Sequence, residues 1–178
     1  MFNHLLQIAS FKSGPQHFKT PIWAVVVCAL LFVVVQAYAL SLTPGNDLIR
    51  MVVASTLKTA VLAALLFGWM SSVDCKQDFL SVLMAFVFVS LLAEVVKLPL
   101  TQMVRDLKDT GDAITALLIS IPIWAIMVWN IWVLYYCVKQ VAQRGTVEVI
   151  VVIIVFVMVS EVAGSVFSQV GVPIDLMG

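Results

Sequence analysis

Several polar side chains that could do chemistry lie inside otherwise apolar runs of this sequence. Lys58 stands in the stretch "VASTLKTAVLAA", and Glu94 and Lys97 stand in "LLAEVVKLPL". Glu161 and Gln36 interrupt two further apolar runs. Inside a membrane such residues face other helices or a water-filled cavity, where they form ion pairs, proton relays or ligand sites. The chemistry to consider is therefore charge pairing, proton transfer or ligand binding.

The depth of these residues predicts one intramembrane cluster. Counted from the predicted outer helix ends at about 1.5 Å per residue, Lys58 lies roughly 15 Å deep, and Glu94 and Glu161 lie roughly 10 Å deep. Lys58 is expected to form a buried ion pair with Glu94 or with Glu161. Glu94 can also pair with Lys97, one helical turn away. Gln36 lies at a similar or shallower level, and the two acids and two amines cancel.

Two interpretations of this cluster stay open. In the structural one, the ion pairs only hold the helices in register. In the functional one, the cluster lines a polar cavity that opens to the outside and binds a small ligand, a lipid headgroup or a proton. A charge at the centre of a lone helix costs about 2.5–3.5 kcal/mol on insertion scales, so both interpretations turn the side chains inward.

The composition places these residues in a bilayer. Of the 178 residues, 62% are hydrophobic and 11% are charged, whereas soluble domains contain roughly 45–50% apolar and about 25% charged residues. A soluble domain of this size has too little interior to hide so much apolar surface. Ten basic and ten acidic residues cancel, which gives no reason to expect a nucleic-acid partner.

Five apolar segments reach the length of about 20 residues that a spanning helix needs. We expect helices, because lipid requires backbone groups to be satisfied within each segment, and barrel strands are shorter and alternate polar with apolar residues. The predicted fold is an all-α, polytopic membrane bundle with a short N-terminal interfacial helix. The predicted spans are residues 21–42, 48–73, 79–100, 113–138 and 147–170.

The segments outside the spans predict the orientation. Residues 1–20 are expected to form a cytoplasmic segment with a short interfacial helix, and residues 171–178 a short external tail. The Lys and Arg residues of the loops favour an inner-membrane protein with a cytoplasmic N-terminus and an external C-terminus. On the predicted inner side are Lys12, Lys19, Lys76, Lys139 and Arg144; on the outer side are Arg50, Arg105 and Lys108.

Further residues within the spans predict how the helices pack. Pro122 should kink the fourth span, since proline removes a backbone hydrogen bond, and Asn130, in the inner half, should form an interhelical hydrogen bond. Small residues recur every fourth position on the second and fifth spans and should allow close helix approach. We therefore expect the second, third and fifth spans to surround the charged cluster. The two small-residue stripes are Ala60, Ala64 and Gly68, and Ser160, Gly164 and Ser168.

The layout resembles that of a known family. Five spans with short loops, "FKSGPQHFKTP" before the first span and "IWAIMVWNIWVLYYCVKQ" in the fourth are similar to bacterial members of the Yip1-like family. The resemblance implies a small polytopic protein with a cytoplasmic N-terminus. It supplies no catalytic residue set to carry over.

The sequence favours a non-enzymatic role. It has no nucleotide-binding, zinc-protease or Gly-rich phosphate motif, no metal-ligand pattern, and neither a histidine nor a deep aspartate within a span. No cofactor is expected. The main prediction is a scaffold or accessory subunit of a membrane complex, in contact with the bilayer and with a protein partner or a second copy of itself. The alternative is a small oligomeric transporter or channel subunit that uses the Lys–Glu cluster.

Overall fold

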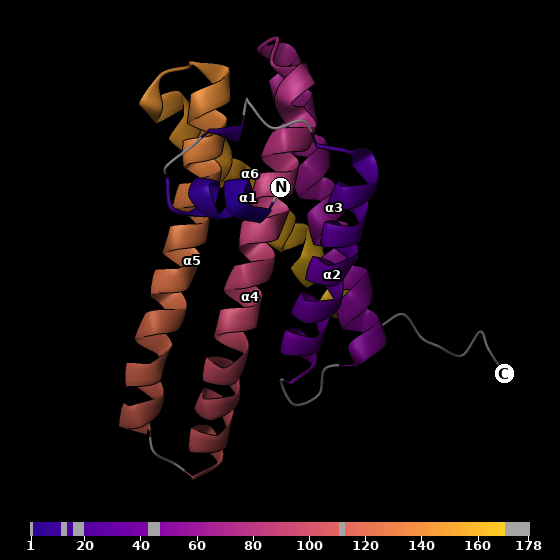
Figure 1. Ribbon diagram of the computed structural model, residues 1–178. Helices are drawn as coiled ribbons and strands as arrows, with labels where there is room; N and C mark the ends of the chain where they lie inside the picture. The colour runs from indigo at the N-terminus through magenta and orange to yellow at the C-terminus, as the bar shows by residue number, and fades with distance from the viewer. Residues whose placement is uncertain (1, 12–13, 16–19, 43–46, 111–112, 170–178) are drawn as a thin grey trace, which may run out of the picture.

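The protein is an all-α bundle, as the sequence predicts (Figure 1). The computed structural model describes residues 2–11, 14–15, 20–42, 47–110 and 113–169, and it contains no strand within these ranges. The predicted tail, residues 171–178, lies outside the described residues. The elements are α1 (Phe2–Ala9), α2 (Ile22–Ser41), α3 (Leu48–Ser72), the 3-10 turn η2 (Lys76–Asp78), α4 (Phe79–Thr110), α5 (Ala113–Ala142) and α6 (Thr146–Gln169).

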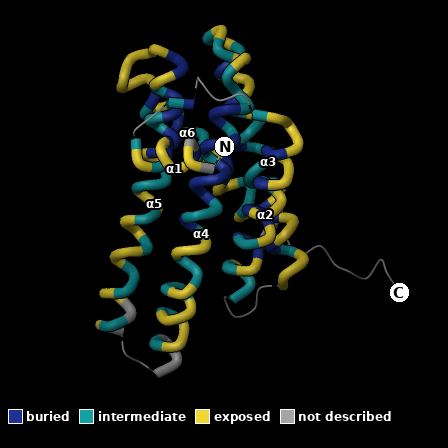
Figure 2. Tube along the Cα trace, viewed as in Figure 1, coloured by how far each residue is buried: buried dark blue, intermediate teal, exposed yellow. Residues whose placement is uncertain are grey.

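Helices α2 to α6 are each long and apolar enough to cross a membrane, so the chain is a multi-pass membrane protein. Exposed positions recur along these helices (Figure 2), and many of them carry large apolar side chains. Such a surface is stable in lipid but not in water, because it leaves large apolar areas outside the protein interior. The helix bounds agree with the predicted spans to within one residue at both ends of α2, α3 and α6, and at the start of α4 and α5.

Two predicted span ends are wrong. The fourth span was expected to end at residue 138, but α5 ends at Ala142; the end of the third span differs more. The third span was expected to end at Leu100, before a long charged loop, but α4 continues through Pro99 to Thr110. A proline removes one intrahelical hydrogen bond, and a membrane helix tolerates this loss when nearby groups compensate. The carbonyl that loses its donor at Pro99 is that of Val95, four residues earlier. Two residues beyond the proline, the Thr101 hydroxyl donates to the carbonyl oxygen of Lys97 at 3.0 Å. At about 1.5 Å per residue, the 32 residues of α4 extend about 48 Å, more than a typical hydrocarbon core.

The five spanning helices form a bundle that is open on one side. Contacts run from α5 to α4, then to α2, α3 and α6, whereas α5 and α6 share far fewer contacts. Figure 1 shows α6 starting beside α5, then passing behind α4 and away from α5. We call the end of the bundle where α5 joins α6 the near end, and the end where α4 joins α5 the far end. The described chain ends at the far end, opposite α1, as an odd number of spans requires.

Helix α1 lies across α4 and α5 toward the near end (Figure 1). Its Leu5 and Ile8 side chains are buried against the bundle. Beyond the helix, the Tyr136 hydroxyl donates to the carbonyl oxygen of Phe11 at 3.2 Å. The N-terminal segment is therefore fixed to α5.

The two small-residue stripes behave differently. A Cβ atom at Gly164 of α6 would lie 3.4 Å from the Cβ of Lys58 and 3.6 Å from the carbonyl oxygen of Ala54, both on α3. This glycine therefore lets the two helices approach closely. A Cβ atom at Gly68 of α3 would meet no described atom within 4 Å, and Ala60 and Ala64 are exposed. The expected packing role of the α3 stripe is therefore wrong. The side chain of Ser168 lies outside the described residues.

This contrast gives a test of the α3–α6 contact. We expect Gly164→Leu to destabilise the protein by about 1–3 kcal/mol, because the larger side chain must push α3 away from α6. Gly68→Leu is the matched control and should change stability little, since the space around that position is open. Thermal unfolding in detergent measures both variants. Equal losses of stability in the two variants would contradict the packing described here.

Candidate functional site

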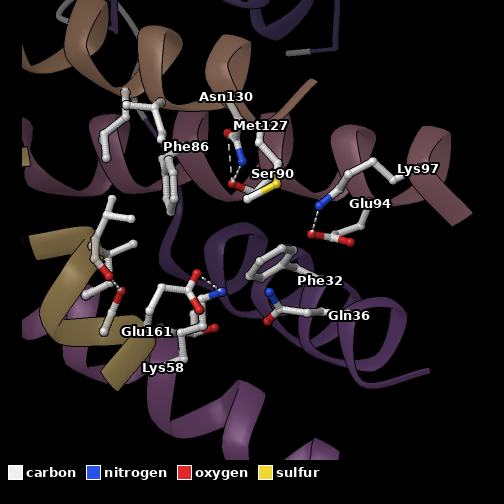
Figure 3. Close-up of a pocket in the computed structure, with 16 residues that line it drawn as sticks. Phe32, Gln36, Lys58, Phe86, Ser90, Glu94, Lys97, Met127, Asn130 and Glu161 are labelled. Carbon is white, nitrogen blue, oxygen red and sulfur yellow. Dashed lines mark hydrogen bonds and ion pairs between the residues drawn. The ribbon is translucent and has the colours of Figure 1, made fainter. Parts of the chain in front are cut away.

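The polar residues of the spans converge on one cavity of about 110 Å³ that α2, α3, α4, α5 and α6 all line (Figure 3). The sequence placed its cluster among the second, third and fifth spans. That prediction is too narrow, since α2 and α5 also supply part of the wall. The polar and charged residues of the lining are Gln36, Lys58, Thr59, Ser90, Glu94, Lys97, Asn130, Ser160 and Glu161.

An ion pair joins α3 to α6 on one wall of the cavity. The Nζ atom of Lys58 lies 2.5 Å from Oε1 of Glu161. The close helix approach at Gly164 brings the Lys58 stem against α6, and this position lets the ammonium reach a carboxylate on the neighbouring helix. Of the two acidic partners that the sequence allowed for Lys58, the structure therefore selects Glu161 over Glu94.

A second ion pair lies within α4. The Nζ atom of Lys97 donates to Oε1 of Glu94 at 2.6 Å, between residues three apart on one turn. The charged cluster thus consists of two separate pairs. Residues three or four apart on a helix are neighbours on its surface, and this explains why the pair forms without help from another helix.

The expected burial of the ion pairs is wrong. The exposed fractions of the Lys58 and Glu161 side chains are 25% and 56%, and those of Lys97 and Glu94 are 16% and 12%. None of the charged residues that the structure describes is fully buried. The physical reason is the open side of the bundle, which leaves the pairs facing a cavity where a tightly packed interior was expected.

Gln36 on α2 lies between the two ion pairs (Figure 3) and is only 6% exposed. Its Oε1 atom is buried and accepts no hydrogen bond from any residue that the structure describes. Gln36 also lines an adjoining cavity of about 220 Å³, which contains Ser55, another buried residue whose hydroxyl lacks a described partner. A buried polar group without a partner costs about 1–3 kcal/mol. Bound water or a ligand is the usual explanation for such groups.

Asn130 of α5 forms the predicted interhelical hydrogen bonds. Its Nδ2 atom donates to Oγ of Ser90 on α4 at 3.1 Å, and Oγ of Ser90 lies 3.2 Å from Oδ1 of Asn130. The sequence treated Asn130 as separate from the charged cluster, but the structure places it in the same cavity. Pro122 does not line the cavity: it lies on an exposed part of α5, which continues through it, and the predicted kink stays a prediction.

The sequence analysis missed two residues of the site, Ser90 and Thr59. Serine and threonine are common in membrane helices because they can bond to their own backbone, as Thr59 does to the carbonyl oxygen of Ser55 at 2.8 Å. Their presence alone therefore carries no signal. The available signal was spacing: Ser90 precedes Glu94 by four residues and shares its helix face.

Comparisons of the chain with protein-family models, with curated proteins and with solved structures find no match. The resemblance to the Yip1-like family therefore stays a prediction. What the cavity does is argued below from its own residues.

The ion pair between α3 and α6 can be measured by a double-mutant cycle. We expect Lys58→Met and Glu161→Gln each to destabilise the protein, and the double variant to recover about 1 kcal/mol relative to the sum, because each single change leaves one charge unpaired. Reversible unfolding in mixed detergent gives the three free energies.

The pair Lys139→Met and Glu161→Gln provides the control for this cycle. Lys139 donates to the carbonyl oxygen of Arg144 and to the Thr146 hydroxyl at the near end, outside the cavity, so the two effects should add to within about 0.5 kcal/mol. Simple additivity of Lys58→Met and Glu161→Gln would show that the ion pair contributes nothing to stability.

Proposed function

We propose that this protein is a non-enzymatic membrane protein that binds a small zwitterionic ligand in its central cavity, as a transporter or channel subunit does. The observation that carries the proposal is Gln36, a buried amide oxygen without a described partner, situated between two ion pairs in one cavity. Binding sites for small ligands combine apolar walls with a few polar groups that converge on the ligand. The cavity has both features.

The charges of the lining favour a ligand that carries both signs. Lys58 and Glu161 lie on one wall and Glu94 and Lys97 on another (Figure 3). A ligand with an ammonium and an anionic group can approach an acid with one end and an amine with the other. A ligand of a single charge would instead face equal numbers of attractive and repulsive groups.

A scaffold role explains less of the site. If the polar groups served only to link helices, the Lys58–Glu161 pair and the hydrogen bonds between Ser90 and Asn130 would be accounted for. The buried position of Gln36 would stay unexplained, since its amide oxygen accepts no hydrogen bond from any residue that the structure describes.

The orientation belongs to the same proposal. Following the Lys and Arg residues of the loops, we place the near end in the cytoplasm and the far end outside. The ion pairs lie on the far-end side of the cavity, because Lys58 precedes Leu62 on α3 and Glu94 follows Phe86 on α4. The site is thus expected to accept ligands from the outer side.

Access and ligand class can be tested by cysteine modification. In a variant without the three native cysteines, Ser160→Cys places a thiol on the cavity wall, and Ala85→Cys places one in the core away from the cavity. In right-side-out membrane vesicles, a membrane-impermeant, charged thiosulfonate reagent should modify position 160 at least tenfold faster than position 85. β-Alanine, a zwitterion, should slow the reaction at position 160 several-fold.

The controls for ligand class are propionate and propylammonium, which match β-alanine in length but carry one charge each. They should slow the modification less than β-alanine does at equal concentration. Failure of the reagent to reach position 160 from the outer side, or equal protection by all three probes, would contradict the proposal.

A further inference from the structure

The cavity opens sideways, between α5 and α6. Of the residues that line it, those classed as exposed are Met127 and Ile131 on α5 and Glu161 on α6, whereas the lining residues of α2, α3 and α4 are buried or half-buried. Figure 1 shows the same two helices diverging toward the far end. Because α5 and α6 both span the membrane, this opening faces the lipid.

The lining also changes from apolar to polar along the membrane normal. On α4, Phe86 is followed toward the far end by Ser90, Glu94 and Lys97. These residues cover about 16 Å at 1.5 Å per residue. On α6 the polar Ser160 and Glu161 lie farther toward the far end than Val157. On α2, α3, α4 and α6 the near-end part of the lining is therefore apolar and the far-end part is polar. On α5, which runs from the far end to the near end, Met127 lies on the far-end side of Asn130, so this helix does not follow the gradient.

This gradient matches an amphiphile in the leaflet at the far end. In that leaflet a lipid keeps its headgroup toward the far face and its chain toward the bilayer centre. A chain in the same orientation within the cavity would contact Phe86, Ile131 and Leu134. Its headgroup would lie among Gln36 and the two ion pairs (Figure 3). A water-soluble zwitterion would satisfy the polar part alone and leave the apolar part uncovered.

We propose that the ligand is a single-chain amphiphile with a zwitterionic headgroup that enters from the far-end leaflet between α5 and α6. The cavity of about 110 Å³ holds only part of such a ligand, so the rest of the chain lies in the lateral opening. This inference rests on the proposed zwitterion site and adds the acyl chain and the lateral path. The headgroup has room to extend past Lys58 and Glu161, since both residues also line the adjoining cavity of about 220 Å³.

The test uses the Ser160→Cys variant in vesicles of phosphatidylglycerol, an anionic lipid. We expect a few mole per cent of lysophosphatidylethanolamine to slow thiol modification at least fivefold. Glycerophosphoethanolamine, which has the same headgroup without a chain, should slow it less than twofold at the same total concentration. Lysophosphatidylglycerol, which has a chain but an anionic headgroup, should leave the rate unchanged. Asp106→Cys, exposed in the charged far-end segment of α4, is the control for nonspecific effects of the lysolipids on the reagent.

Each other pattern overturns a defined part of the account. Equal protection by glycerophosphoethanolamine and lysophosphatidylethanolamine would contradict recognition of the acyl chain but would be consistent with a zwitterion site. Equal protection by the two lysolipids, or equal slowing at positions 106 and 160, would overturn headgroup recognition. No protection by any of these probes, together with none by β-alanine, would overturn the zwitterion site itself.

The lateral path is tested by narrowing the opening. Ile131→Trp adds bulk at a lining position of α5, and Val128→Trp adds the same bulk at an exposed position of α5 outside the lining. We expect Ile131→Trp to reduce the protection by lysophosphatidylethanolamine at least fivefold, while the soluble reagent still modifies position 160. Val128→Trp should change neither the protection nor the rate of modification. Met127→Phe replaces Ile131→Trp if the latter does not give a monodisperse protein. Full protection in the narrowed variants would overturn lateral entry.

Discussion

The ion pair between Lys58 and Glu161 is the interaction on which the arrangement of the site depends. Hydrocarbon cannot solvate either charge, so each is stable in the bilayer only near an opposite charge or a polar cavity. The pair fixes α3 against α6 at the level where Gly164 allows close approach. With α3 and α6 held together, and α4 held between α2 and α5, the remaining boundary between α5 and α6 stays open.

The open boundary explains why the polar groups are only partly covered. A closed bundle would have to bury Glu94, Lys97 and Glu161 completely, and desolvation of buried charges can exceed the gain from pairing. An open cavity keeps the charges in contact with water or with a polar ligand. It also leaves Gln36 with an unmet hydrogen bond. The same openness that lowers the cost of the charges thus creates the conditions for binding.

Much of the fold follows from the sequence, because bilayer thickness sets the length of a spanning helix. The lengths of the apolar segments predict where the five spans start. The polar residues within these segments predict most of the charged residues of the site. The end of α4 was not predictable from residue types. Pro99 usually marks a helix end in water, whereas here the helix continues past it to Thr110. The acidic partner of Lys58 could not be predicted either, since Glu94 and Glu161 lie at similar depths. Periodicity alone also does not show that Gly164 packs against another helix while Gly68 does not.

The central claim is that polar residues of all five spans meet at one cavity, with Glu161 at its lateral opening. Spin labels on α6 test it most directly, since Ser160 lines the cavity and the adjacent Val159 lies on the exposed surface. The account predicts that a label at position 160 collides mainly with a water-soluble nickel chelate, and that a label at position 159 collides mainly with oxygen dissolved in the lipid. Preference for oxygen at both positions would contradict it.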